Sequence, residues 1–439
     1  MSKLLPKGHK KLLNAWAFYD WANSVYNLTI SSAVFPIFWG ALTIVRNDQG
    51  EIVNDTVRFL GYDFNNDSLI SYVTALAFLT VSIISPLLSG IADYVGNKKN
   101  FLKFFCYLGA LSCIGLYWFN LEHLWFGLLC YFLALIGFWA SLVFYNSYLP
   151  DIAFPEQQDA ISAKGYSLGY IGSVILLIIN LVMILKYEWF GFESEGVPTR
   201  LSFIMVGVWW IGFSQYTYYY LPRGNKKDVI TKAVIFNGFK ELKMIWKALQ
   251  NDIRLRRYLS AFFVYSMAVQ TIMLIATYFG IEELDWGEQN PTTGLIISIL
   301  LIQLVAVFGA YLTSKASSKF GNIQTLIVIN FIWIGICVYA YTITTPYQFY
   351  VTAAIVGLVM GGIQALSRST YSKLLPEDAV DTASYFSFYD VSEKIGIVIG
   401  MFSYGIIAQV TGSVRYSILF LILFFVVGLV LLFRVPKTK

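Results

Sequence analysis

The stretch 414–434 reads VRYSILFLILFFVVGLVLLFR, and no charged residue interrupts it between Arg415 and Arg434. Crossing the hydrocarbon core of a bilayer, about 30 Å thick, takes about 20 predominantly apolar residues in helical form. A barrel strand would instead alternate between apolar and polar residues over about ten positions. A helix also satisfies its own backbone hydrogen bonds inside lipid. We therefore predict that this stretch is a transmembrane helix.

Stretches of the same kind recur along most of the chain. Of its 439 residues, 57% are apolar and only 13% are charged, a balance far from that of an ordinary soluble domain. The sequence thus predicts an all-α, multi-pass membrane protein with twelve transmembrane helices. The predicted spans are 22–45, 69–93, 101–120, 123–149, 163–185, 201–221, 258–281, 291–314, 324–343, 348–371, 382–409 and 414–434.

Residue types that serve enzymes and metal sites are scarce. His9 and His123 are the only histidines, which argues against a histidine metal site and against a Ser/His/Asp triad. No phosphate-binding loop of the Walker type occurs, so we do not expect ATP-driven transport by this chain alone. We expect no enzymatic activity, no metal and no cofactor. The cysteines fall inside predicted spans without the spacing of zinc ligands or disulfides, and they are Cys106, Cys113, Cys130 and Cys337.

Basic residues predict the orientation, because lysine and arginine in short loops stay in the cytoplasm. The N-terminal arm carries Lys3, Lys7, Lys10 and Lys11, and residues 223–257 carry ten basic residues. The loops predicted on the opposite side are acidic. We therefore expect the plasma (inner) membrane with both termini in the cytoplasm, and no cleaved signal peptide. The net charge of +5 then reflects topology, so no nucleic-acid partner is expected.

The central basic segment divides the chain. We predict an N-terminal six-helix bundle at 1–222, a basic cytoplasmic linker at 223–257 and a C-terminal six-helix bundle at 258–439. The linker is expected to contain an amphipathic helix lying on an anionic membrane surface, as an interfacial strap rather than a binding site. Its apolar residues are Phe239, Leu242, Trp246 and Leu249, and its opposite face carries Lys240, Lys243 and Lys247.

An internal repeat supports the division into two bundles. Residues 89–97, SGIADYVGN, match 314–322, SKASSKFGN, at an offset of 225. Residues 148–151, YLPD, match 374–377, LLPE, at an offset of 226. Nearly equal offsets indicate duplication of a six-span unit and hence pseudo-symmetry. Repeats of this kind place a substrate site between the halves, near the membrane midplane.

The first repeat resembles the loop signature of the major facilitator superfamily. The positions that fit are Asp93, Gly96, Lys98 and Lys99. Ser89 stands where glycine is usual, Tyr94 where arginine is usual, and Ser318 replaces the aspartate in the second half. The resemblance implies the major facilitator fold and a gating loop that latches the cytoplasmic ends of neighbouring helices. The alternative is a plain tight turn with solvated lysines.

The chain is also similar to the vacuole-effluxer-like permeases, a branch that includes the autophagy-related vacuolar amino-acid effluxers and bacterial relatives, with which we group it. Motifs that carry the similarity are YDWANS at 19–24, FYN at 144–146 with LPD at 149–151, GYIG at 169–172 and GGIQALSRS at 361–369. One position departs: relatives tend to carry an aspartate before Val-Gln-Thr in span seven, where this chain reads YSMAVQT at 265–271. If that aspartate binds a cation or proton in relatives, coupling here must differ or rest on other acids.

Charged residues at membrane depth cost roughly 2.5–3.5 kcal/mol on insertion scales, so each needs a partner or a use. Asp20 leads the candidates, with Asn23, Tyr26 and Asn27 near it. It could face a substrate ammonium or a proton, or it could be an interfacial aspartate at a helix start. Arg368 could hold a carboxylate of the substrate, although an inter-helical salt bridge is the role we favour.

A cluster in span eleven provides further candidates. Asp390, Glu393 and Lys394 are spaced to pair within one helix turn, and the acids could carry a proton or form a structural network. Other polar residues could shape the cavity or bridge helices as hydrogen-bond glue. They are Tyr145, Asn146, Gln270 and Gln364. The glycines, whose role could be close packing or bending, are Gly169, Gly172, Gly361, Gly362, Gly396 and Gly400.

These features favour a secondary active transporter that works by alternating access and is driven by a proton or another cation. The family resemblance implies a small solute such as an amino acid. The partners expected are this substrate, the lipid bilayer and the coupling ion, and we expect a monomer. Two alternatives stay open, a lipid or drug exporter and a transport-inactive scaffold or receptor.

Overall fold

The computed structural model describes residues 5–47, 52–224, 232–376, 379 and 381–436. Within them, twelve helical stretches are long and apolar enough to cross a membrane, as predicted. The first six spans are built from α1 (Lys10–Val25) with the π-helix η1 (Tyr26–Ala33) and α2 (Val34–Thr43), then α3 (Asn66–Val95), α4 (Lys98–Gly115) with η2 (Leu116–Trp118), α5 (Leu124–Asn146) with α6 (Leu149–Ile152), α7 (Pro155–Leu185) and α8 (Gly196–Tyr220). Between the last two lies the short helix η3 (Tyr187–Phe190).

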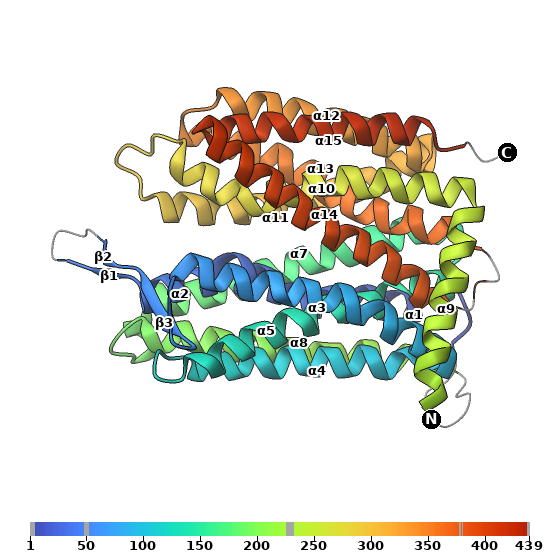
Figure 1. Ribbon diagram of the computed structural model, residues 1–439, viewed down its shortest axis with the longest axis horizontal. Helices are drawn as coiled ribbons and strands as arrows, with labels where there is room; N and C mark the ends of the chain where they lie inside the picture. Colours follow the sequence, from blue (N-terminus) through green and yellow to red (C-terminus); the bar gives the residue numbers. More distant parts are fainter. Residues whose placement is uncertain (1–4, 48–51, 225–231, 377–378, 380, 437–439) are drawn as a thin grey trace.

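The other six spans follow a helix that does not cross the bundle. This helix is α9 (Lys232–Asn251), and the spans are α10 (Ile253–Glu282), α11 (Pro291–Phe320), α12 (Asn322–Thr342), α13 (Pro346–Leu374), α14 (Thr382–Thr411) and α15 (Val414–Phe433). Figure 1 shows the spans running side by side, with α9 across their ends. Both ends of the chain lie at this end of the bundle, which we call the terminal side.

The first span begins earlier than predicted. Hydropathy placed it at 22–45, whereas the helical run covers Lys10–Thr43. Asp20 therefore lies ten residues inside the run and is only 4% exposed, not at its start. The polar residues that lower the local hydropathy, among them Asn23, are buried against other helices instead of facing lipid. The same holds for α7, which starts at Pro155 and buries Asp159.

The opposite end, which we call the hairpin side, carries a feature that the sequence analysis did not predict. Two antiparallel hairpins follow the first span: β1 (Val45–Arg46) pairs with β2 (Ile52–Asn54), and β3 (Thr56–Phe59) pairs with β4 (Tyr62–Asn65). The second hairpin closes through Leu60 and Gly61, both with positive φ, 52° and 87°. That two-residue turn suits the right-handed twist of paired strands.

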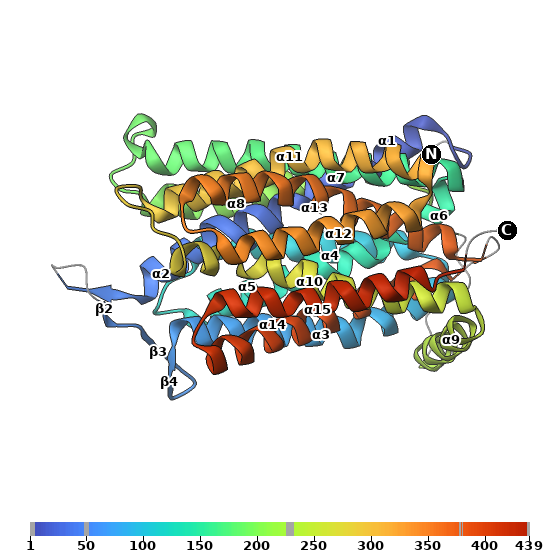
Figure 2. The same ribbon diagram turned by 90° about the horizontal axis from the view of Figure 1, so that it is seen from above.

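The buried apolar residues gather in two large clusters, one drawn mainly from the first six spans and one mainly from the last six. Between the halves, α7 packs against α11 and α13, and α3 packs against α14. Figure 2 shows α7 beside α11 and α3 beside α14 from above. A site between the halves is therefore bordered by these helices.

Close approach of helices explains the paired glycines of span ten. A Cβ atom on Gly361 would lie 2.2 Å from the carbonyl oxygen of Ala306, and one on Gly362 would lie 2.1 Å from Oγ1 of Thr313. Both neighbours belong to α11. Of the two roles considered for these glycines, the structure thus shows tight packing of α13 against α11.

Candidate functional site

A cavity of about 230 Å³ lies between the two halves. Its walls combine apolar side chains, such as Phe138, Leu142 and Met273, with charged and amide side chains. The predicted site residues that line it are Asp20, Asn23, Asn27, Asn146, Gln270, Gln364, Arg368, Asp390 and Glu393. Apolar walls with a few convergent polar groups are the usual makeup of a small-molecule site.

An ion pair joins the two halves at one end of this cavity. Both Nη atoms of Arg368 on α13 lie 3.2 Å from Oδ2 of Asp20 on α1. The hydroxyl of Tyr145 donates to the same oxygen at 2.9 Å. Asp20 is 4% exposed and Arg368 2% exposed, so both charges are withdrawn from water. Breaking a buried pair on one side leaves an uncompensated charge, which is strongly destabilising.

The guanidinium of Arg368 uses its remaining donors on the first half as well. Nη1 donates to Oδ1 of Asn146 at 3.2 Å, while Nε donates to Oγ and Nη2 to the carbonyl oxygen of Ser162 at 2.9 and 3.0 Å. The rings of Trp16 and Tyr166 flank it, with centroids 4.8 and 4.2 Å from its central carbon. Arginine presents five N–H donors in a rigid fork. Here all five donate to acceptors of the first half.

Glycine makes room for this ion pair. A Cβ atom on Gly165 of α7 would lie 2.4 Å from Oδ2 of Asp20 and 3.1 Å from Nη2 of Arg368. On the next turn, a Cβ atom on Gly169 would lie 2.5 Å from Oγ of Ser24 on α1. Any larger residue at 165 would push the two charged groups apart.

A second charged cluster occupies the span-eleven side of the cavity. Nζ of Lys394 lies 2.5 Å from Oδ1 of Asp390 and 3.2 Å from Oε2 of Glu393. Oε1 of Glu393 accepts from Nε2 of Gln270 at 2.7 Å, which ties α14 to α10. The ring of Trp139 on α5, in the other half, lies 3.8 Å from Nζ of Lys394. Oδ2 of Asp390 is buried and has no hydrogen-bond partner among the described residues.

The other predicted site residues divide between cavity and core. Oε1 of Gln364 accepts from the hydroxyl of Tyr170 at 2.7 Å, a further contact between halves. Asn23 faces the cavity, and its Nδ2 has no partner within the part of the chain that is described. Tyr26, expected beside the substrate, is not part of the lining. Its ring packs on Phe138 and Trp210 inside the first half.

The residues of the predicted gating loop contact the second half on the terminal side. Asp93 at the end of α3 accepts from the backbone N–H of Ser384 at 2.7 Å and of Ala383 at 3.3 Å, which caps the start of α14. A carboxylate is favourable at a helix N-terminus. Nζ of Lys98 forms an ion pair with Asp151 and donates to Oγ1 of Thr382. These contacts connect the first half to the second, which a plain turn would not do.

The remaining loop residues support the turn itself. Gly96 has a φ of 68°, a conformation that L side chains rarely adopt. Nζ of Lys99 is buried and donates to the carbonyl oxygen of Leu221 at 2.6 Å, which holds the end of α8. Ser318, in the place of the aspartate of the second loop, stays on its own helix and donates to the carbonyl oxygen of Lys315.

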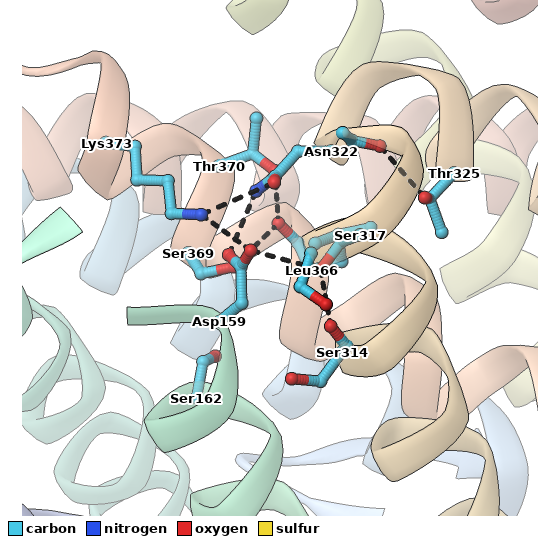
Figure 3. Close-up of polar contacts among 12 residues, drawn as sticks. Asp159, Ser162, Ser314, Ser317, Asn322, Thr325, Leu366, Ser369, Thr370 and Lys373 are labelled. Carbon is cyan, nitrogen blue, oxygen red and sulfur yellow. Dashed lines mark hydrogen bonds and ion pairs between the residues drawn. The ribbon is translucent and has the colours of Figure 1, made fainter. Parts of the chain in front are cut away.

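A carboxylate from the first half compensates for that missing aspartate. Oδ2 of Asp159 on α7 lies 2.6 Å from Nζ of Lys373 and accepts from Oγ of Ser317 at 3.0 Å. Its Oδ1 accepts from Nδ2 of Asn322 at 2.9 Å. Figure 3 shows Asp159 at the centre of these contacts, facing residues of α11, α12 and α13. The Asp159 cluster therefore joins the first half to three helices of the second.

The sequence analysis missed several residues of these contacts, notably Ser162, Asp159, Lys373 and Trp139. None belongs to a periodic pattern that distinguishes it from neighbouring polar residues. The one usable signal was in the repeat: the loss of the aspartate at Ser318 predicts that another acid must approach this loop. It does not say that the acid comes from α7.

Replacing Asp159 with asparagine should loosen the terminal side, because hydrogen bonds to a charged group are worth about 1.5–3 kcal/mol. Backbone hydrogen exchange reports the free energy of local opening, which the substitution lowers. We therefore expect exchange in 155–162 and 366–374 to become about tenfold faster. Hydrogen–deuterium exchange with mass spectrometry measures this. Asp285→Asn, which alters an aspartate of the α10–α11 connection on the hairpin side, is the control. Unchanged exchange in Asp159→Asn would show that the cluster does not hold the halves together.

Comparison with known proteins gives a consistent family. The profile of the family described as "vacuole effluxer Atg22 like" matches residues 8–439. The MFS-type transporter YxiO of Bacillus subtilis (strain 168) is 32% identical, over 98% of this chain and 96% of its own length. Autophagy-related protein 22 of Kluyveromyces lactis is 24% identical, over 98% of this chain and 94% of its own length.

Among solved structures, the fucose:proton symporter FucP of E. coli has a similar fold. The two align with a TM-score of 0.67 at 13% sequence identity, covering 98% of each chain. Identity this low supports the fold alone. The described helices thus have the major facilitator arrangement predicted from the loop at 93–99.

Proposed function

Because this chain belongs to the vacuole effluxer Atg22-like family of MFS-type transporters, we propose that it carries small zwitterionic solutes, such as amino acids, across the membrane. The observation that carries the proposal is the cavity between the halves, whose lining includes charged groups of both signs. Transport then proceeds by alternating access, in which the two halves rock about this cavity.

The lining matches the chemistry of a free amino acid. An α-carboxylate needs a fork of N–H donors, and Arg368 is the cation on the lining. An α-ammonium needs acceptors, and Asp390 and Glu393 supply carboxylate oxygens on the same lining. The apolar residues between these groups, such as Leu142 and Met273, suit an aliphatic or aromatic side chain. On binding, the substrate carboxylate competes with Asp20 for Arg368, which weakens a contact between the halves.

Charge counting supports coupling to a proton. The formal charges of Asp20 and Arg368 cancel, whereas Asp390 and Glu393 face the single positive charge of Lys394. One negative charge in this cluster is uncompensated, which is unfavourable at membrane depth. A proton on one carboxyl group, or the ammonium of the substrate, would neutralise it. Exchange between these two cations would link the movement of substrate to the movement of protons.

The contacts between the halves support an outward-facing state. The Asp93 cap and the Asp159 cluster close the terminal side, while the cavity lining includes Asn27 and Thr277, which lie nearer the hairpin side. An outward-facing state takes the terminal side to be cytoplasmic, in the inner membrane of a bacterium, a location that the basic residues of 223–257 support. Inward opening would then require both sets of contacts to break.

Proteoliposome transport tests the proposal. We expect uptake and counterflow of a labelled amino-acid mixture by the wild type, with uptake sensitive to an imposed proton gradient. Asp20→Asn should lower both at least tenfold, since charge-assisted hydrogen bonds to Arg368 are lost. Asp63→Asn, at an exposed aspartate of β4, is the matched control and should transport normally. No flux of any amino acid would overturn the substrate class and favour labelled lipids or drugs as the next substrates to assay.

A further inference from the structure

The helix α9 lies across the terminal ends of the spans, nearly perpendicular to them, as Figures 1 and 2 show. It packs against α3 of the first half and against α10 and α14 of the second. Its buried face includes Ile245 and Leu249, which are 5% and 3% exposed. At its edge, the ring of Trp246 lies 5.8 Å from that of Phe388 on α14. The helix therefore touches both halves at the point where they are closed.

The opposite face of α9 is basic and unpaired. Lys240, Lys243 and Lys247 are exposed, and no acidic side chain of the described residues forms an ion pair with any of them. Beside these lysines, Met244 and Trp246 expose 54% and 51% of their surface. A helix that combines exposed ammonium groups with half-exposed apolar side chains fits the interface between water and lipid.

We propose that α9 is a binding surface for anionic phospholipid headgroups. It lies level with the ends of the transmembrane helices, where headgroups are present, and its lysines complement their phosphate charge. The half-exposed ring of Trp246 is placed for insertion beside the acyl chains, as tryptophans at membrane interfaces are. The surface goes beyond the transport proposal and rests only on the cytoplasmic location of the terminal side, where anionic lipids are enriched.

Lipid binding at α9 has a mechanical consequence. The helix bridges α3 and α14, and the same two helices are joined by the Asp93 cap on Ser384. Separation of the halves on this side must move α9 away from one of them. Lipids that hold α9 against both halves therefore favour the closed terminal side, and the composition of the leaflet sets the balance between the two transport states.

Native mass spectrometry of the full chain in mixed micelles tests the surface. With equal amounts of phosphatidylglycerol and phosphatidylcholine offered, the wild type should retain phosphatidylglycerol preferentially. Lys243→Gln with Lys247→Gln should reduce that preference on the order of tenfold, given the contribution of each lysine at a charged membrane surface. The matched control is Arg58→Gln with Lys186→Gln, which removes two exposed cations on the hairpin side and should keep the preference.

Equal loss of the phosphatidylglycerol preference in both double variants would show that net charge causes it, and would overturn the assignment to α9. No loss of the preference in either variant would overturn the assignment as well. Binding of free inorganic phosphate without lipid preference would do the same. The measurement needs no substrate, so its failure is distinct from a failure of the transport proposal. As a second readout, hydrogen exchange in 382–390 of the wild type should slow when phosphatidylglycerol replaces phosphatidylcholine in nanodiscs, and it should not respond in the α9 variant.

Discussion

Replacing Arg368 with glutamine is expected to lower counterflow at least a hundredfold. The substitution leaves Asp20, which is 4% exposed, as a buried carboxylate without its cation, and the hydroxyl of Tyr145 is then its one remaining donor among the described residues. Removing one partner of a buried ion pair costs about 3–5 kcal/mol. It also removes the only cation that the cavity lining offers to a substrate carboxylate within the described residues. The thermal midpoint of unfolding should fall together with the rate.

Two further variants separate the structural role of Arg368 from its role toward substrate. Arg368→Lys keeps the charge but not the fork, so we expect a stable protein with much weaker substrate binding. Arg368→Gln combined with Asp20→Asn removes both charges, and the midpoint of unfolding should return toward the wild-type value while transport stays lost. Restored transport in the double variant would show that the ion pair is structural and that Arg368 does not bind substrate.

Replacing Asp390 with asparagine is expected to abolish accumulation against a gradient, whereas counterflow should fall but persist, because Glu393 still offers a carboxylate to the substrate ammonium. In the wild type, the cluster of Asp390, Glu393 and Lys394 carries one uncompensated negative charge and must take up a cation to become neutral. Asparagine at 390 leaves one carboxylate against one ammonium, so the cluster is already neutral. It then has no reason to bind a proton during the cycle, and the accumulation ratio should fall to one.

The groups that contact the cluster of Asp390, Glu393 and Lys394 should keep their places in Asp390→Asn, so that a change in accumulation reports the loss of the carboxylate. Gln270 on α10 donates to Glu393, and the ring of Trp139 on α5 lies against Lys394, so Asp390→Asn should leave those contacts in place. The measurement is accumulation of labelled substrate with an imposed proton gradient, with an entrapped pH dye reporting proton flux. Glu283→Gln, which alters the ion pair with Arg415 outside the cavity, is the control. Proton-driven accumulation that survives in Asp390→Asn would place the coupling group elsewhere.

The membrane fold could be predicted from the sequence because burial in lipid acts on each span separately. A helix such as 414–434 must be apolar over about twenty residues whatever its neighbours are, so twelve spans could be located one at a time. The same reasoning misplaced the start of the first span at 22. The polar residues before it, such as Asp20, face protein, and hydropathy cannot distinguish a polar face in a bundle from a polar face in water.

The sequence predicted many residues of the candidate site but not the residues that they contact on other helices. Asp20, Arg368, Asp390 and Glu393 stood out because an ionisable group at membrane depth is costly wherever it lies. The pairing of Asp390 and Glu393 with Lys394 followed from helical spacing alone, and the structure contains it. Tyr26 was included with Asp20 because it is close in sequence, yet its ring packs against Phe138 and Trp210 in the core of the first half.

What the sequence determined by itself is therefore the membrane fold, the repeated halves and the set of costly polar groups, since each of these depends on the nature of a segment taken alone. Only the tertiary structure decided which groups meet. Asp20 and Arg368 are 348 residues apart, and Asp159 reaches Lys373 across the interface between the halves. Such contacts depend on how rigid helices are arranged. A contact between residues on different helices produces no periodic pattern in the sequence from which it could be predicted.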